Sequence, residues 1–410
     1  MIDVTYIHRD LEQECMAAVK DFPVVAISGP RQSGKSTMLQ ELFSETHQLI
    51  SFDNPTVRDK FIGDPQLFIN QLKDRVILDE IQYVPEITSY IKVMIDGERQ
   101  RKGRFLLTGS QQFALIKNLG DSLAGRVGLL YLLPFGIEEK KRIAAIREKF
   151  GSTMERFTHG CLVGSYPEIA TDPSIDRERW YESYLQTYLE RDVRSLSNIG
   201  NLRDFQHFIR LLAGRCGQIL NYSSFSRELG ISVPTVKRWI SILEASQIIF
   251  LLPPYYRNLG KRITRSPKLY FLDVGLACYL TGHHTEELLL NGPMAGAFFE
   301  NFVIQETVKT YFNHGKRPDI FYIRTHNDLE IDLLLERALE LYPVEIKLTQ
   351  TPRGGMVKPI ERFRKLLSKV TIHEGRFITL ADGEDYRLTE NVRLCDLGSF
   401  LKTIPLSDAM

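Results

Sequence analysis

The fold is decided by the stretch Gly29-Pro-Arg-Gln-Ser-Gly-Lys-Ser36, which directly follows the apolar run PVVAIS at residues 23–28. It matches the pattern GxxxxGK(S/T) of a phosphate-binding loop between a buried strand and a helix. Gly29 and Gly34 let the backbone turn so that its N–H groups point at phosphate oxygens, and the helix N-terminus adds partial positive charge. A glycine-rich turn before an ordinary helix is the alternative interpretation.

The loop predicts a defined set of contacts to ATP. Lys35 is expected to reach the β- and γ-phosphates, and the Ser36 hydroxyl to take one position around Mg²⁺. Nucleotide contacts are expected along the whole loop, from Gly29, Pro30, Arg31, Gln32, Ser33, Gly34, Lys35, Ser36 and Thr37.

A later apolar run, Val76-Ile-Leu-Asp-Glu80, ends in two carboxylates. Asp79 is expected to hold Mg²⁺, usually through water, and Glu80 to polarise the water that attacks the γ-phosphate. An acidic pair at a strand end is common by itself. After a phosphate loop, the pair favours hydrolysis of the nucleotide over simple storage.

Two more positions are candidates for the same site. The strand at 104–107 ends in Thr108-Gly-Ser-Gln111, where a polar side chain can sense the γ-phosphate or orient water, although a plain strand-end turn is the alternative. Arg126 is a candidate for the cation that completes charge neutralisation, within the chain or across a subunit interface, and Arg191 is a second candidate. A surface salt bridge would explain Arg126 nearly as well.

The organisation of the chain follows from its apolar pattern. Short runs rich in Val, Ile and Leu at 23–28, 47–52, 75–80 and 104–109 are separated by segments long enough for helices. This alternation is typical of βα crossovers and a parallel sheet. A change of character after Pro134 and the break Asn291-Gly-Pro293 divide the chain into 1–140, 141–290 and 291–410.

The ordered motifs GPRQSGKST (29–37), ILDEIQ (77–82), LLTGSQQF (106–113) and SLAGRVGLLYLLPFG (122–136) resemble the AAA-like ATPases of bacteria and archaea that carry a DUF4143 region. The similarity continues through GCLVGSYPE (160–168) and YLERDV (188–193) and covers nearly the whole chain. The resemblance implies an ATPase fold at the N-terminus, a winged helix in the middle and a nuclease-like fold at the C-terminus.

The middle segment has helix-turn-helix spacing. Residues 223–230 predict a short helix closed by glycine, and 234–245 predict a second helix with Pro234 in its first turn. The following stretch, 255–268, carries five basic residues, two tyrosines and no acidic residue. It suits contact with a DNA backbone, and a solvated hairpin used for protein contacts is the alternative.

The C-terminal segment holds a second constellation of charged residues. Glu300 lies on a predicted helix, Asp332 on a strand, and Glu345-Ile-Lys347 on the next strand, which is the arrangement of a PD-(D/E)xK nuclease. The three carboxylates can hold a divalent ion, Mg²⁺ or Mn²⁺, and Lys347 can orient water and stabilise a charged phosphate. A buried ion pair between Lys347 and an acid would produce the same pattern.

Taken together, these patterns predict an α/β protein with three parts. The first is a parallel-sheet P-loop ATPase domain, the second a helical and winged-helix domain, and the third an α/β restriction-endonuclease-like domain. Catalytic roles are predicted for Lys35, Glu80, Arg126 and Lys347, and metal binding for Ser36 and Asp79 with ATP and for Glu300, Asp332 and Glu345 in the last domain.

Composition limits the remaining classes. Among 410 residues, 52 Lys and Arg balance 51 Asp and Glu, so any nucleic-acid surface must be a local patch. Five dispersed cysteines, a polar N-terminus and the lack of an apolar run of membrane-spanning length predict a cytoplasmic protein without a membrane partner. A homo-oligomer or a protein partner is compatible with the sequence.

Two functions remain as alternatives. The first is an ATPase that couples hydrolysis to action on nucleic acid, with a nuclease site in its last domain. The second is an ATP-dependent switch whose last domain binds a partner or DNA without cleaving it. They differ in whether Glu300, Asp332, Glu345 and Lys347 perform chemistry.

Overall fold

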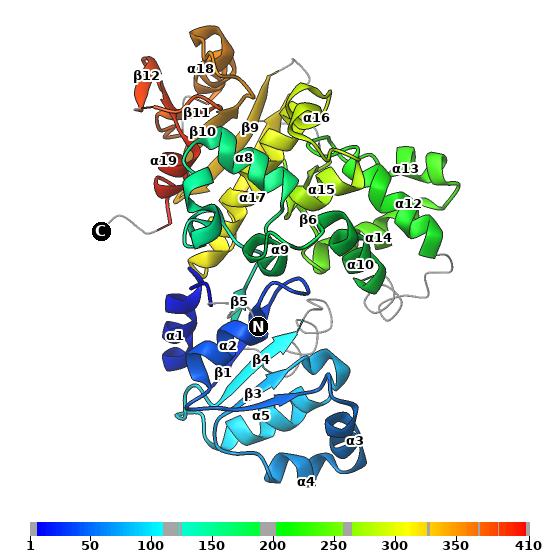
Figure 1. Cartoon of the computed structure of the whole chain (residues 1–410). Coiled ribbons are helices and arrows are strands. Elements are labelled where there is room, and N and C mark those ends of the chain that lie inside the picture. Colours follow the sequence, from blue (N-terminus) through cyan, green and yellow to red (C-terminus); the bar gives the residue numbers. More distant parts are fainter. Residues whose placement is uncertain are drawn as a thin grey trace.

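The computed structural model describes residues 6–109, 123, 125–188, 202–256, 265–325, 329–367, 370–383 and 385–406. The chain forms two lobes, an N-terminal lobe up to Leu132 and a larger C-terminal lobe from Leu133 onward (Figure 1). Within the described ranges, no helix is long and apolar enough to cross a membrane. All five cysteines are buried and carry free thiols.

The N-terminal lobe is built on a five-stranded sheet in the order β2-β3-β4-β1-β5, and every neighbouring pair is parallel. This confirms the parallel sheet predicted from the sequence. The strands are β1 (Val24–Ser28), β2 (Gln48–Ser51), β3 (Val76–Asp79), β4 (Phe105–Gly109) and β5 (Val127–Tyr131). The helices are α1 (Glu12–Asp21), α2 (Lys35–Phe43), α3 (Pro55–Gly63), α4 (Pro65–Asn70) and α5 (Ile87–Gly97), with a 3₁₀ turn at Ile81–Tyr83.

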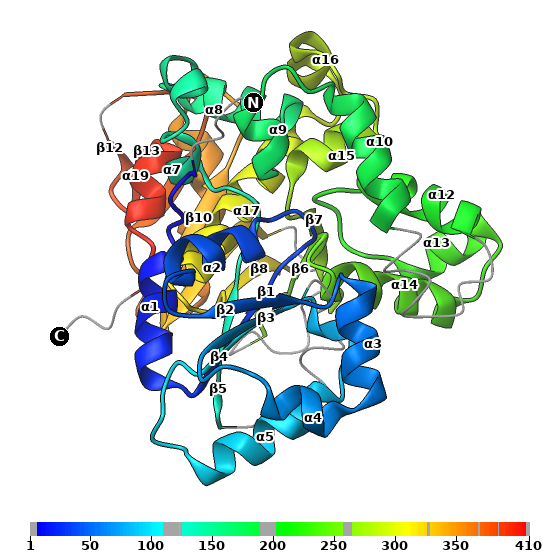
Figure 2. The same cartoon turned by 60° about the horizontal axis from the view of Figure 1, so that its bottom comes forward.

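Helices cover both faces of this sheet, which explains why its central strands are apolar throughout. Val24 and Ala26 pack with residues of α3, α4 and α5, whereas Val25 and Ile27 pack with residues of α1 and α2. Figure 2 shows the sheet between these two helical layers. Because the strands are parallel, their carboxyl ends meet at one edge, where β1 leads into α2.

The C-terminal lobe begins with helices and a strand pair. The helices are α7 (Ile137–Lys140), α8 (Thr153–Leu162), α9 (Pro167–Thr171), α10 (Arg177–Tyr188), α12 (Leu202–Ala213), α13 (Tyr222–Leu229), α14 (Val233–Ala245), α15 (Val274–Leu280) and α16 (Glu286–Asn291), with a 3₁₀ turn at Ala144–Lys149. Strands β6 (Ile249–Leu252) and β7 (Lys268–Phe271) pair antiparallel. Helices α13 and α14 lie within one residue of the segments predicted from the sequence.

The remainder of the lobe is a mixed sheet with helices around it. Its strand order is β12-β13-β11-β10-β9-β8. The elements are α17 (Ala295–Asn313), β8 (Ile320–Arg324), β9 (Glu330–Arg337), β10 (Glu340–Ile346), α18 (Lys358–Leu366), β11 (Gly375–Ile378), β12 (Tyr386–Thr389), β13 (Val392–Cys395) and α19 (Leu397–Lys402), with a 3₁₀ turn at Gly354–Val357. Strands β8, β9 and β10 are antiparallel, and β10, β11 and β13 are parallel.

Helix α17 is the centre of the C-terminal lobe, and most of its side chains are buried. It packs against α8 and α15 of the preceding segment as well as against β10 and α19. One continuous apolar core therefore runs from Leu133 to Ile404. Core residues of α17 therefore pack against elements on both sides of the predicted boundary near residue 290.

Candidate functional site

The phosphate loop lies at the carboxyl edge of the N-terminal sheet, between β1 and α2. Gly34 has φ = 91° and Gln32 has φ = 59°, so the loop contains two left-handed residues. A side chain at position 29 would place its Cβ 2.1 Å from the carbonyl oxygen of Leu132. This distance is a steric clash, so only glycine fits at this position. The backbone path therefore depends on both glycines of the motif.

The side chains of the loop divide into a buried and an exposed set. Lys35 is buried, and its Nζ donates to the carbonyl oxygens of Gly29 (3.0 Å) and Pro30 (2.8 Å). The Ser33 hydroxyl is buried without a hydrogen-bond partner. Gln32 and Thr37 are exposed, while Arg31 is half-buried.

Asp79 lies beside the loop and is held by hydroxyl groups from three directions. Its Oδ1 accepts from Ser36 Oγ at 2.5 Å and from Thr108 Oγ1, and its Oδ2 accepts from Ser51 Oγ at 3.1 Å. The carboxyl ends of β2, β3 and β4 bring these groups together. Ser51 was not predicted, although it stands opposite Asp79 in the register of the parallel strands.

Glu80 has a left-handed backbone with φ = 56°, a conformation that is costly for a residue with a side chain. Its carboxylate accepts from Gln82 Nε2, and its N–H donates to Thr108 Oγ1 at 3.2 Å. Thr108 thus contacts both members of the acidic pair. In the structure it positions Asp79 and the Glu80 backbone. Ser110 and Gln111 lie outside the described residues.

Arg9 holds the loop from a segment that carried no signal in the sequence. Its guanidinium donates to the Ser33 carbonyl (2.7 Å), the Leu133 carbonyl (2.6 Å) and Glu139 (2.8 Å), and the residue is only 4% exposed. It joins the phosphate loop to the start of the C-terminal lobe. A basic residue ahead of the first helix could not be distinguished from a surface arginine, since all its partners are distant in the sequence or are backbone atoms.

Arg126 lies at the amino ends of the parallel strands, whereas the phosphate loop lies at their carboxyl ends. In the parallel pairing of β5 with β1, Val127 stands beside Val24 and Tyr131 beside Ser28, so Arg126 precedes the amino end. Its Nε pairs with Asp96 of α5 at 2.8 Å. At about 3.3 Å per residue the separation from the loop is roughly 16 Å. The expectation that Arg126 serves a nucleotide bound by its own chain is therefore wrong, and Arg191 lies outside the described residues.

The second constellation lies on β9 and β10. Asp332 Oδ2 accepts from the Ile346 N–H and from Lys347 Nζ, both at 2.9 Å. Lys347 Nζ also lies 2.7 Å from Glu345 Oε1. The Asp332 and Glu345 side chains are buried, whereas the Lys347 side chain is 44% exposed. The structure thus brings these three predicted residues together.

Glu300 belongs to the same cluster but has different partners. Its Oε1 lies 3.0 Å from Lys268 Nζ and accepts from Tyr270 OH at 2.5 Å. Lys268 Nζ also lies 2.7 Å from Glu330 Oε1. Lys268 was counted in the basic stretch expected to contact a DNA backbone, but the structure buries its side chain in this cluster. Tyr270 and Glu330 were not identified from the sequence.

The electrostatics of the cluster are those of buried, interacting charges. Burial raises the pKa of Glu345, and together with the charges of Asp332 and Glu300, against the opposing effect of Lys347, brings it to about 8. Burial also raises the pKa of Glu300. For Lys347, burial lowers the pKa but the carboxylates of Asp332 and Glu345 outweigh it, so the net shift is upward.

The two sites differ in how well their residues fit a metal. At the phosphate loop, the Ser36 hydroxyl and the Asp79 carboxylate are adjacent oxygen donors suited to Mg²⁺ with a nucleotide. In the carboxylate cluster, Glu345 Oε2 is buried without a hydrogen-bond partner, so Asp332 and Glu345 fit a divalent ion. Among the described residues, however, no group of three acidic, His or Cys side chains is arranged to hold a metal ion.

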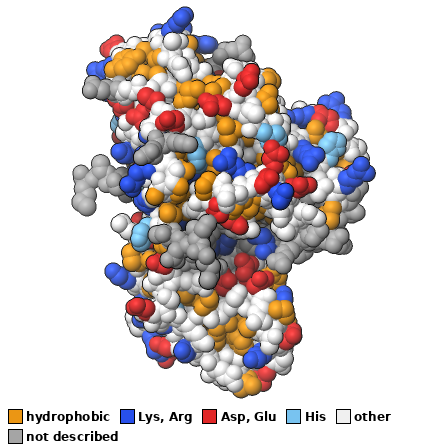
Figure 3. All heavy atoms as spheres, viewed as in Figure 1, with side chains coloured by type: hydrophobic (Ala, Val, Ile, Leu, Met, Phe, Trp, Pro, Cys, Tyr) orange, Lys and Arg blue, Asp and Glu red, His pale blue; other side chains and the backbone are white. Residues whose placement is uncertain are grey.

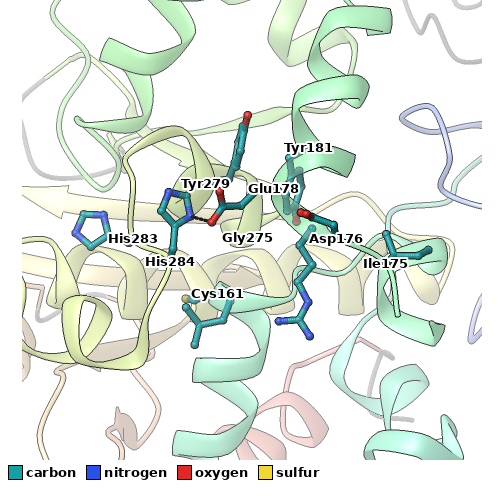
Figure 4. A pocket seen from close by; sticks show the side chains of 11 residues that line it. Cys161, Ile175, Asp176, Glu178, Tyr181, Gly275, Tyr279, His283 and His284 are labelled. Carbon is teal, nitrogen blue, oxygen red and sulfur yellow. Dashed lines mark ion pairs between the residues drawn. The ribbon is translucent and has the colours of Figure 1, made fainter. Parts of the chain in front are cut away.

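A separate hollow of about 440 Å³ lies between α8, α10 and α15 (Figure 4). Tyr181 and Tyr279 stack within it at a centroid distance of 5.4 Å, and His284 Nδ1 lies 3.4 Å from Glu178 Oε1. None of the residues predicted to be functional lines it. Apart from Arg126, the predicted residues instead lie around the phosphate loop and in the cluster formed by α17, β9 and β10.

The chain aligns with solved structures over much of its length. The Walker-type ATPase PABY2304 of Pyrococcus abyssi aligns at 17% identity and a TM-score of 0.43, over 66% of this chain and 94% of that one. The RuvB Holliday junction branch migration motor of Thermotoga maritima aligns at 17% identity and a TM-score of 0.30, over 60% of this chain and 89% of RuvB.

Family models divide the chain into three regions. Residues 21–140 match an AAA domain (AAA_14), residues 154–287 match a domain of unknown function (DUF8612), and residues 295–400 match a domain of unknown function (DUF4143). The middle region, which was expected to share the DUF4143 assignment, thus matches a model of its own. The phosphate loop, the parallel sheet and the AAA match define a P-loop ATPase of the AAA type.

Two relatives match most of the chain. The uncharacterized protein Rv2008c of Mycobacterium tuberculosis is 31% identical over 346 residues, which are 84% of this chain and 74% of that protein. An uncharacterized protein of Methanocaldococcus jannaschii is 22% identical over 323 residues, 68% of this chain and 66% of its own. The chain belongs to the same family as the mycobacterial protein, with an AAA-type ATPase domain and a C-terminal DUF4143 domain.

Replacing Arg9 by Ala should destabilise the protein strongly. It would leave the Glu139 carboxylate, which is fully buried, without its cation, and removing one partner of a buried ion pair costs about 3–5 kcal/mol. Urea denaturation should show this loss, and Arg9→Lys should be intermediate because an ammonium cannot span all three acceptors. Arg142→Ala is the control, since Arg142 also joins the two lobes but is 42% exposed. Equal losses in the Arg9 and Arg142 variants would contradict this role.

The raised pKa of Glu345 should make stability depend on pH. Between its ordinary value of 4.5 and about 8, the folded protein retains a proton that the unfolded chain releases, so the free energy of unfolding should fall as the pH rises through this window. Urea denaturation in chelator across this range should show a flatter profile for Glu345→Gln than for wild type. The exposed Glu287→Gln variant should follow wild type. A Glu345→Gln profile parallel to wild type would refute the shift.

Proposed function

We propose that this protein binds and hydrolyses ATP with Mg²⁺ and couples hydrolysis to an action on nucleic acid by the C-terminal lobe. The observation that carries the ATPase part is the joining of Ser36, Asp79, Thr108 and Glu80 at the strand ends beside Lys35. In P-loop enzymes this set of groups binds the metal and the terminal phosphates and positions the water.

Each residue has a distinct task in this proposal. Lys35 neutralises the β- and γ-phosphates, while Ser36 and Asp79 hold Mg²⁺, which offsets phosphate charge when bound. Glu80 accepts a proton from the attacking water, and Gln82 orients its carboxylate. The hydroxyls of Ser51 and Thr108 keep Asp79 in one orientation.

Arg126 would take part only across an interface. Its place at the amino edge of the sheet and its pairing with Asp96 direct it away from the loop of its own chain. A neighbouring chain that docked this edge against its phosphate loop would receive Arg126 as an additional cation. The proposal for Arg126 is thus also a proposal of a homo-oligomer.

The unit of α12, α13, α14, β6 and β7 supports a role at nucleic acid. Its helices and antiparallel strand pair follow in the order of a winged helix. In the space-filling view, Lys and Arg side chains gather over α12 and α13 (Figure 3). The exposed basic residues of the three helices are Arg203, Arg210, Arg227, Lys237 and Arg238. Residues 257–264, which carry most of the basic stretch predicted to contact DNA, lie outside the described ranges.

The carboxylate cluster supports metal-dependent cleavage of a phosphodiester. Helix α17 followed by β8, β9 and β10 places Glu300, Asp332, Glu345 and Lys347 in one cluster. Asp332 and Glu345 would hold Mg²⁺ or Mn²⁺, which would polarise the phosphate and a water ligand. Lys347, which is partly exposed beside them, would orient the water and offset charge on the phosphate.

A second function has one specific observation in its favour. Two lysines already pair with the four carboxylates of the cluster, Lys268 with Glu300 and Glu330, and Lys347 with Asp332 and Glu345. A cluster balanced in this way can persist as a structural element. The protein would then be an ATP-dependent switch whose last domain binds a partner or DNA without cleaving it.

A path of buried polar contacts supports coupling between the lobes. Arg9 joins the loop to Glu139, and the Ile137 N–H donates to Glu306 Oε2 on α17 at 2.8 Å. Glu300 lies on the same helix. A change in the loop that altered the position of α7 would therefore act on the helix that carries part of the carboxylate cluster.

Replacing Glu80 by Gln should separate ATP binding from hydrolysis. Loss of the general base should lower kcat by about 10²–10⁴-fold, while ATP affinity measured by calorimetry stays within about threefold of wild type. Lys35→Ala should lose ATP binding itself, because the phosphates lose their buried cation. The exposed Glu86→Gln variant is the matched control and should hydrolyse normally. Normal turnover by Glu80→Gln would remove Glu80 from the mechanism.

Cleavage of DNA should decide between the two functions. Plasmid, linear duplex and single-stranded DNA are incubated with Mg²⁺ or Mn²⁺, with and without ATP, beside Asp332→Asn and Lys347→Ala. Cleavage by wild type that both variants lose would establish the nuclease site, and the exposed Lys365→Ala variant should cleave like wild type. No cleavage of any substrate under any condition would favour the switch.

A further inference from the structure

Lys268 enters the carboxylate cluster from outside the segment that supplies the predicted metal ligands. It is the first residue of β7, where its backbone pairs with Leu252 of β6 and bridges to Ile219. Because β7 is held on both sides, the backbone position from which the Lys268 side chain extends is fixed. The Lys268 side chain is 3% exposed, and its ammonium lies inside the cluster.

The ammonium bridges two carboxylates from different elements. It lies 3.0 Å from Glu300 Oε1 on α17 and 2.7 Å from Glu330 Oε1 on β9. It also faces the ring of Tyr322, whose centre is 5.5 Å away. Its charge is stabilised by Glu300, Asp332 and Glu330, which together outweigh the effect of burial and raise its pKa.

The same contacts occupy Glu300. A carboxylate oxygen has two lone pairs, and Oε1 of Glu300 already accepts from Lys268 and from Tyr270 OH. Mg²⁺ would require an oxygen at about 2.0–2.1 Å with a free lone pair. Oδ2 of Asp332 is engaged in the same way, by Lys347 Nζ and the Ile346 N–H, and what sets the Asp332 and Glu345 end apart is that Glu345 Oε2 is buried with no hydrogen-bond partner.

The cluster therefore has a closed end and an open end. At the closed end the lysine is buried: the Lys268 side chain is 3% exposed, while its partners Glu300 and Glu330 are 17% and 36% exposed. At the open end, Lys347 is 44% exposed beside Asp332 and Glu345. Each end holds a lysine, but a divalent ion entering from solvent meets the partly exposed Lys347 at the Asp332 and Glu345 end, whereas the Lys268 side chain is buried at the other end.

We propose that Lys268 takes the place of a second divalent ion, so that the cluster binds one metal through Asp332 and Glu345 while Glu300 serves as the counter-ion of Lys268. The inference rests on the proposed metal site of the C-terminal lobe. It assigns Lys268 as a positioning residue and removes Glu300 from the set of metal ligands.

Binding of Mn²⁺ to the full-length protein tests this assignment without requiring cleavage. Free Mn²⁺ is followed by electron paramagnetic resonance, without nucleotide and in a Ser36→Ala background that removes a ligand from the phosphate loop. The protein should bind one Mn²⁺ ion, and Asp332→Asn should lose it. Glu300→Gln should keep the Mn²⁺ affinity within about threefold of the parent protein. Loss of a contact that supports a metal ligand would instead lower the affinity on the order of tenfold or more. Lys268→Met should gain a second ion, and the gain should vanish in Lys268→Met/Glu300→Gln.

The controls separate the possible failures. Lys365→Met, at an exposed position on α18, should bind one ion like the parent protein. Two ions in the parent protein, or a tenfold loss in Glu300→Gln, would overturn the role of Lys268 while leaving the metal site intact. No ion in the parent protein would overturn the metal site and this inference together. If Lys268→Met does not fold, the comparison of Glu300→Gln with Asp332→Asn still decides the question.

Discussion

A buried ion pair across the boundary between the lobes, Arg9 with Glu139, is the contact on which much of the rest of this structure depends. Arg9 and Glu139 are almost completely buried, as are Glu306 and Lys309 of α17, and an unpaired charge in such a place would be strongly destabilising. Lys309 Nζ reaches the Phe135 carbonyl and Ser165 as well as Glu306. Because Arg9 also donates to the Ser33 carbonyl, the Arg9–Glu139 pair links the phosphate loop to the C-terminal lobe, inside which Glu306 and Lys309 find their own partners.

Both candidate sites use the same construction. Each holds a carboxylate on a strand, Asp79 on β3 or Asp332 on β9, with donors from neighbouring elements. At the phosphate loop the donors to Asp79 are neutral hydroxyls, which leave its negative charge available to a metal. In the C-terminal cluster the donors include two lysines, which offset the charge that attracts a metal. This difference explains why the same residue types suit different tasks in the two lobes.

Much of the nucleotide site was predictable because its residues are close in the sequence or follow strands. Asp79, Glu80 and Thr108 each end an apolar run, and parallel strands bring such ends to one edge. Arg9 and Lys268 were not predictable, because their partners lie up to 130 residues away or are backbone atoms. The predicted role of Arg126 failed in its own chain because Arg126 precedes β5, and the amino ends of the parallel strands lie opposite the carboxyl ends that carry the phosphate loop.

The sequence by itself determined the parallel sheet, the phosphate loop and the identity of the acidic residues. These depend on local periodicity and on motifs whose members are neighbours along the chain. The tertiary structure alone decided which cation stands beside which carboxylate and that α17 unites the predicted second and third domains in one core. The physical reason is that charge pairing and burial depend on distances in space. For a chain of 410 residues these distances are established only when the chain folds.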